Sequence, residues 1–247
     1  MSGHSKWANI KTRKEGQDKK KGKNFSKMAK LIEIAARKGG DPETNPSLRL
    51  TIEKAKSFNM PNDNIVRAIK KGTGEDKEGG ILEELIYEAY GPGGSQLIIE
   101  AITDNKNRTL SDVRHLITEH GGRLAESGSV KWNFNQLGAI SIEKEKVAAK
   151  NKEELELSLI DAGAEDIKWR EDILEVYTKP ENLENLKNVF KNQGLEIDNS
   201  GLEWVPKNEI EIRDEATKKQ IENLLDALDE NDDVKDVYSN INPGTFS

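Results

Sequence analysis

The sequence contains no cysteine among its 247 residues, and aromatic side chains make up only 5% of it. Without cysteine the protein cannot form a disulfide, a thiolate metal site or a thiol nucleophile. No apolar run approaches the roughly 20 residues that a membrane-spanning helix needs. The N-terminal residues also lack the apolar core of a secretory signal. We therefore expect a cytoplasmic protein.

Catalytic and metal-binding signatures are scarce as well. The three histidines are scattered along the chain, and His120 falls at the end of a predicted helix, where a capping role is the simpler interpretation. No G-x-S-x-G motif is present, and the paired acidic residues are neighbours whose side chains point apart. We expect no catalytic residue, no metal site and no cofactor, and thus a protein that is not an enzyme.

What the sequence does contain is a strong segregation of charge. Residues 1–74 hold 18 Lys and Arg against 7 Asp and Glu, a net charge of +11. Residues 75–247 hold 20 against 38, a net charge of −18. A chain divided in this way is typical of a protein with one end that meets a polyanion and a body that stays away from it.

The basic region is predicted to consist of a flexible arm over residues 1–24 and a helical domain over residues 25–74. The arm is nearly free of aliphatic side chains and cannot bury enough apolar surface to become ordered. Three apolar stripes at helical spacing follow, separated by glycine and proline signals, and Gly72 is expected to end the third helix. Residues 75–80 have the composition of a linker.

Beyond the linker, strand-like runs alternate with amphipathic helices, and we predict an α+β multidomain fold. Residues 130–205 hold a complete βαββαβ set of the ferredoxin-like type. The flanking segments, residues 81–129 and 206–241, are each too small to cover a sheet alone. We expect them to form a second ferredoxin-like domain into which the first is inserted, although a serial arrangement is the alternative.

The candidate nucleic-acid-binding residues lie in the arm, just after the arm at Lys27, and on one face of the third helix. They are Lys6, Trp7, Lys11, Arg13, Lys14, Lys19, Lys20, Lys21, Lys23, Lys27, Arg67, Lys70 and Lys71. Lysine ammonium groups release counterions from a phosphate backbone, and a tryptophan can stack on an exposed base. The simpler alternative is a solvated tail. Only 4 of the 18 cations are arginine, which favours recognition of backbone and shape over base reading.

Several ordered motifs together resemble the YebC/PmpR family over essentially the whole chain. They include Gly3-His4-Ser5-Lys6-Trp7, Asn45-Pro46-Ser47-Leu48-Arg49, Asn59-Met60-Pro61, Tyr90-Gly91-Pro92-Gly93-Gly94 and Asp161-Ala162-Gly163-Ala164-Glu165-Asp166. The resemblance implies three domains, with a helical domain at the N-terminus and two α+β domains, one interrupted by the other. It carries no catalytic residue to this chain.

The resemblance also implies a regulator of gene expression. Members of the family carry the label of DNA-binding transcriptional regulators, whereas the mitochondrial translational activator of cytochrome oxidase is associated with translation. Our first hypothesis is a DNA-binding transcriptional regulator, and the alternative is a translation factor that binds ribosomal RNA or the ribosome. A third possibility is an adaptor whose acidic domains bind a protein partner.

Overall fold

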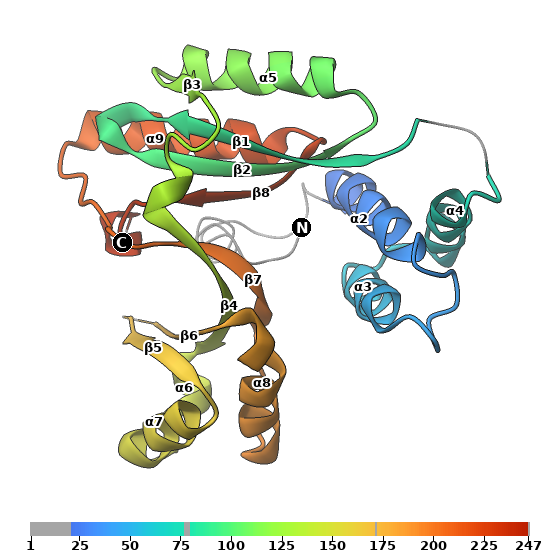
Figure 1. Cartoon of the computed structure of the whole chain (residues 1–247). Helices are drawn as coiled ribbons and strands as arrows, with labels where there is room; N and C mark the ends of the chain where they lie inside the picture. Colours follow the sequence, from blue (N-terminus) through green and yellow to red (C-terminus); the bar gives the residue numbers. More distant parts are fainter. Residues whose placement is uncertain (1–20, 77–79, 171, 247) are drawn as a thin grey trace.

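The computed structural model describes residues 21–76, 80–170 and 172–246, and it shows three bodies (Figure 1). Three helices form one body, and each of the other two is built on a four-stranded antiparallel sheet with helices. The predicted α+β fold is confirmed. Residues 77–79 of the predicted linker over residues 75–80 lie outside the described residues.

The helical domain consists of α2 (Lys21–Ala36), α3 (Pro46–Ser57) and α4 (Asn62–Thr73). Asn45 caps α3, because its side chain accepts a hydrogen bond from the backbone N–H of Leu48. The three predicted stripes meet in one apolar core that includes Met28, Ile32, Leu48, Ile52, Ile65 and Ala68. The arm was predicted to reach residue 24, but α2 already begins at Lys21.

The expectation that Gly72 ends α4 is wrong. The helix continues to Thr73, and Gly74 is the left-handed C-cap, with φ of 79°. Gly72 has a different task, because a Cβ at this position would lie 2.3 Å from the backbone oxygen of Glu33 in α2. Glycine therefore lets α4 approach α2 closely.

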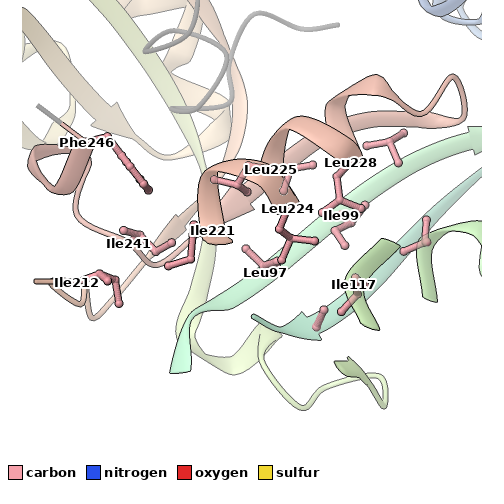
Figure 2. Close-up of a cluster of buried hydrophobic side chains, with 14 residues drawn as sticks. Leu97, Ile99, Ile117, Ile212, Ile221, Leu224, Leu225, Leu228, Ile241 and Phe246 are labelled. Atoms are coloured by element: carbon pink, nitrogen blue, oxygen red, sulfur yellow. The ribbon is translucent and has the colours of Figure 1, made fainter. Parts of the chain in front are cut away.

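The first sheet has the strand order β3-β1-β2-β8. Its elements are β1 (Glu83–Tyr90), β2 (Gln96–Thr103), α5 (Lys106–Glu119), β3 (Arg123–Ala125), α9 (Glu215–Glu230) and β8 (Val234–Ser239). Thus β8 joins a sheet whose other strands come from before the second sheet in the sequence. Figure 2 shows the apolar core between this sheet and its two helices, with Leu97 and Ile99 of β2 facing Leu224 and Leu228 of α9.

The second sheet has the strand order β5-β6-β4-β7. Its elements are β4 (Phe134–Glu143), α6 (Lys144–Val147), α7 (Lys152–Asp161), β5 (Ala164–Trp169), β6 (Ile173–Thr178), α8 (Leu183–Asn192) and β7 (Asn199–Pro206). Element order and strand order together are those of a ferredoxin-like unit. One face of the sheet packs on α7 and α8 through a core that includes Ile140, Leu155, Val176 and Phe190.

Some local predictions differ from the structure. Apolar and polar side chains alternate over residues 130–134, which predicts a strand, but Lys131–Asn133 form a 3-10 turn. Leu137-Gly138 predicts a hairpin turn, but β4 runs through these residues unbroken. Near the C-terminus, Ile210 makes only an isolated bridge to Ile241. The capping-box pattern Thr109-Leu110-Ser111-Asp112 predicts a helix that starts at Thr109, but α5 starts at Lys106 and is capped by Asn105, which accepts the backbone N–H of Arg108.

An apolar contact joins the two sheets. Ile98 and Tyr238 on the face of the first sheet that is opposite its helices pack with Phe134 and Trp204 of the inserted unit. The connection from β3 to β4 crosses beside this cluster, and it is fixed by Glu88, which is 4% exposed. The two sheets are therefore joined by a shared apolar core.

Candidate nucleic-acid interface

The candidate residues of the arm, Lys6, Trp7, Lys11, Arg13, Lys14, Lys19 and Lys20, lie outside the described residues. Lys21 and Lys23 lie in the first turn of α2. The remaining four candidates occupy two helices of the helical domain, and the structure gives them two different environments.

The cations of α4 form an accessible ridge. Arg67, Lys70 and Lys71 are spaced at i, i+3 and i+4, so their side chains lie along one face of the helix. Arg67 and Lys70 are exposed and Lys71 is half-buried, whereas Ile65 and Ala68 point into the core. Within the described parts of the chain, none of the three forms an ion pair. Their positive charges can meet an external anion.

The ridge lies near the C-terminal end of α4, where the helix dipole is negative. Lys70 and Lys71 occupy the last turn of α4, where a cation interacts favourably with the helix dipole. The only acidic residue in the first turn is Asp63. Other exposed cations of the same domain, Lys38, Arg49 and Lys56, add to the positive surface, and sequence reasoning did not single them out. These three residues lie 11 and 7 positions apart in the sequence, so no local cluster of charge marks them.

The structure corrects the expectation for Lys27. This side chain is 5% exposed, and its Nζ donates a 2.5 Å hydrogen bond to the backbone oxygen of Asp229 and lies 3.5 Å from that residue's carboxylate. Burial lowers the pKa of Lys27, and the charge of Asp229 opposes that shift. Lys27 is committed to a contact between α2 and α9, so it cannot meet a phosphate in this arrangement.

Lys30, one turn further along α2, makes a similar contact. Its Nζ donates to Asp233 Oδ1 at 2.5 Å and to the backbone oxygens of Asp232 and Ile102 at 2.9 and 3.1 Å. The Asp233 carboxylate also accepts hydrogen bonds from Arg108 at 3.0 Å and Thr109 at 2.7 Å. The basic helix α2 is therefore anchored to the first sheet domain at the turn between α9 and β8.

Asp233 is the centre of this anchor. Burial would raise the pKa of its carboxyl group, yet the hydrogen bonds from Lys30, Thr109 and Arg108 lower it to about 2. Lys54 of α3 lies near Asp236 on the same side of the sheet, and burial lowers its pKa to about 8. These contacts join residues that lie between 72 and 203 positions apart, and no local pattern in the sequence predicts them.

Two family models together cover nearly the whole chain. The N-terminal domain of the TACO1/YebC protein matches residues 5–75, and the second and third domains of TACO1/YebC match residues 82–241. The chain belongs to the TACO1/YebC family. The boundary between the two matches falls between the helical domain and the first strand of the first sheet.

Relatives of this TACO1/YebC chain extend over almost its full length. A "Probable transcriptional regulatory protein" from Halothermothrix orenii is 47% identical over 97% of this chain and 94% of its own length. A protein of the same name from Thermotoga maritima is 51% identical, with 97% and 93% covered. The crystal structure of the conserved hypothetical protein Aq1575 from Aquifex aeolicus matches with a TM-score of 0.79 and 43% identity, covering 91% of each chain.

The described parts of this TACO1/YebC chain offer little for other chemistry. They hold no cluster of three or more His, Asp or Glu side chains that could bind a metal ion. No helix in them is long and apolar enough to span a membrane.

Proposed function

We propose that this protein is a non-enzymatic regulator of gene expression that binds nucleic acid through its N-terminal region. The observation that carries the proposal is the segregation of charge, +11 over residues 1–74 against −18 over the remainder. A polyanion is attracted to the basic part and repelled by the acidic part, which fixes the orientation of the complex. The names of the relatives, "Probable transcriptional regulatory protein", support a regulatory role and make DNA the first ligand to test.

In this proposal the arm and α4 provide the phosphate contacts. The arm contributes Lys6, Lys11, Arg13, Lys14, Lys19 and Lys20, with Trp7 available for stacking, and Lys21 and Lys23 continue this positive charge into α2. The ridge of Arg67, Lys70 and Lys71 adds a second point of contact on a rigid helix. Because most of these cations are lysines, the contacts position the protein on the backbone and carry little base selectivity.

The test is the salt dependence of binding to a labelled 20-base-pair duplex, measured by fluorescence anisotropy with the full chain. The variant R67Q/K70Q/K71Q removes the ridge. Each lost phosphate contact should reduce the slope of log affinity against log salt by about 0.9, so the slope should become shallower by roughly 2 to 3. Affinity at low salt should fall at least about tenfold.

A matched control removes three cations from the acidic body. Lys106, Lys152 and Lys219 are all more than half exposed, and K106Q/K152Q/K219Q changes the net charge by the same amount. This control should leave the slope unchanged. Equal losses in the two triple variants would show that the ridge is no interface and that only overall charge matters.

The scarcity of arginine favours a second candidate, a translation factor that binds ribosomal RNA. Lysine contacts suit any A-form or B-form backbone, so the choice between the two polymers needs competition at physiological salt. In the DNA proposal, unlabelled duplex displaces the labelled duplex more effectively than ribosomes do at equal phosphate concentration. Preferential displacement by ribosomes would reverse the assignment.

A further inference from the structure

The helical domain is held to the rest of the protein in a different way from the two sheet domains. The sheets share an apolar cluster in which Ile98 and Tyr238 meet Phe134 and Trp204. Among the described residues, the apolar cores of the helical domain and of the first sheet domain are separate. Charged side chains on and just after α2 cross this boundary with two ion pairs and several hydrogen bonds to backbone oxygens, so the helical domain can detach without exposing a shared apolar cluster.

The ionic contacts converge on one acidic corner, which we define as Asp229, Asp232 and Asp233 at the turn from α9 to β8. The backbone oxygen of Asp229 is one of the last carbonyl groups of α9, where the helix dipole is negative, and Lys27 donates to it. Asp233 and Asp232 bind Lys30. The corner thus attracts cations by its charge and by its exposed carbonyl groups.

The coordination of Lys30 resembles that of a lysine bound to phosphate. A lysine ammonium group has three N–H donors, and here the three acceptors are Asp233 Oδ1 and the backbone oxygens of Asp232 and Ile102. All donors of Lys30 are therefore used by oxygen atoms of the protein itself. Lys27 is 5% exposed, and its Nζ donates to the backbone oxygen of Asp229 and lies 3.5 Å from the Asp229 carboxylate. Neither lysine can contact a polyanion until the corner releases it.

We propose that the acidic corner is an autoinhibitory contact that competes with nucleic acid for Lys27 and Lys30. The inference rests on the proposed function and adds a regulatory step to it. In the docked state, in which the acidic corner holds Lys27 and Lys30, the protein binds nucleic acid through the arm and α4 alone. A polyanion that displaces the corner gains two more cations on α2, and the helical domain then separates from the first sheet domain. Docked and released states are populated according to their difference in affinity for the polymer.

Docking can be measured directly because the chain has no cysteine. Nitroxide labels at S57C on α3 and S111C on α5, both exposed positions, report the distance between the two domains by double electron–electron resonance. We expect a single narrow distance distribution for the full chain at 0.1 M salt. The variant D229N/D233N should broaden it, whereas E119Q/E215Q, with the same charge change at exposed sites of the same domain, should not.

Binding supplies the second readout. Releasing the two lysines should raise the affinity of D229N/D233N for the 20-base-pair duplex about three- to tenfold above that of E119Q/E215Q. Since Asp233 also supports Arg108 and Thr109, the single variant D229N serves as a milder change with a smaller effect in the same direction. The variant K27M/K30M should broaden the distances in the same way but without any gain in affinity.

The outcomes separate this inference from the proposed function. A narrow distance distribution in D229N/D233N, or an affinity equal to that of the E119Q/E215Q control, would overturn the autoinhibitory contact while leaving nucleic-acid binding intact. Failure of the wild-type chain to bind any duplex or RNA would overturn the proposed function, and with it the competition for the two lysines. Broadening of the distances by D229N/D233N would then show only that the corner holds the domains together.

Discussion

Replacing Glu88 by glutamine should weaken the connection between the two sheet domains. The Glu88 carboxylate is 4% exposed and accepts three backbone N–H groups of the segment that leads into the inserted unit. Oε1 accepts from Gly128 at 2.6 Å, and Oε2 accepts from Val130 at 2.8 Å and Lys131 at 2.9 Å. This one side chain fixes the direction in which the chain crosses from the first sheet to the second.

The magnitude follows from the hydrogen bonds that are lost. Bonds to a charged acceptor contribute about 1.5–3 kcal/mol each, and a buried donor left without a partner costs about 1–3 kcal/mol. Glutamine keeps one oxygen and places an NH₂ group against at least one of the three backbone N–H groups. We expect E88Q to lower the free energy of unfolding by about 2–4 kcal/mol, which shifts the urea midpoint downward by about 1 M or more.

The pH dependence gives a sharper signature. Burial would raise the pKa of Glu88, but the hydrogen bonds from Gly128, Val130 and Lys131 hold it below its ordinary value. A carboxyl group with a lowered pKa in the folded state stabilises the fold above the unfolded pKa of about 4.3, and this stabilisation is lost as the pH falls below that value. The difference between wild type and E88Q should therefore be complete at pH 7 and shrink below about pH 4.

Urea unfolding followed by tryptophan fluorescence is a suitable assay, because Trp132 and Trp204 lie at this junction. The control is E84Q, because Glu84 is an exposed glutamate on the same face of the same strand. E84Q should change the free energy of unfolding by less than about 0.5 kcal/mol. If E88Q unfolds at the same urea concentration as E84Q at pH 7, the assigned role of Glu88 is refuted.

Three further changes test other parts of the structure. G72A places a Cβ 2.3 Å from the backbone oxygen of Glu33, so we expect it to lower the free energy of unfolding of the helical domain by about 1–3 kcal/mol, measured by thermal unfolding. The control is T73A at the neighbouring exposed position, which should have a smaller effect. D214A removes the side chain that caps α9 by accepting the N–H of Thr217 at 2.8 Å, and about 1 kcal/mol should be lost from the urea-derived stability. The carboxyl group of Asp233 has a lowered pKa of about 2, so it stabilises the folded protein above about pH 3.9, and this stabilisation is lost as the pH falls towards 2. The wild type should therefore lose more free energy of unfolding between pH 4 and pH 2 than D233N does. Equal losses in the two proteins would contradict the assignment.

Local sequence signals accounted for most of the elements. The three predicted stripes of the helical domain are confirmed. In the same way, Asp214 followed by apolar residues at helical spacing predicts a capped amphipathic helix, and the structure has α9 there, capped by Asp214. Such features depend on neighbours three or four positions apart, so a short window contains the information. The two four-stranded sheets were predictable by counting elements, because neither flanking segment could cover a sheet alone.

The remaining features depend on residues that are distant in the sequence. From the sequence, Lys27 is one more cation of the basic region, yet it contacts Asp229, 202 positions away. The sequence predicts that Gly72 ends a helix, yet glycine is required there because the backbone oxygen of Glu33, in another helix, leaves no room for a Cβ. The strand β3 has only three residues and exists because it pairs with β1. In each case a partner outside any local window decides the role of the residue.

The same distant contacts change how the segregated charge should be interpreted. The sequence counts Lys27 and Lys30 with the basic end, but in the folded chain their charge is neutralised by the acidic corner of the other half. In the ridge on α4, Arg67 and Lys70 are exposed and form no ion pair among the described residues, and only the half-buried Lys71 lies near an acidic group, Glu33. Since buried and paired cations are screened little by salt and exposed ones strongly, the two sets differ in how they respond to ionic strength. The positive charge available to a polymer is therefore smaller than the count of lysines suggests, and it increases only when the helical domain leaves the acidic corner.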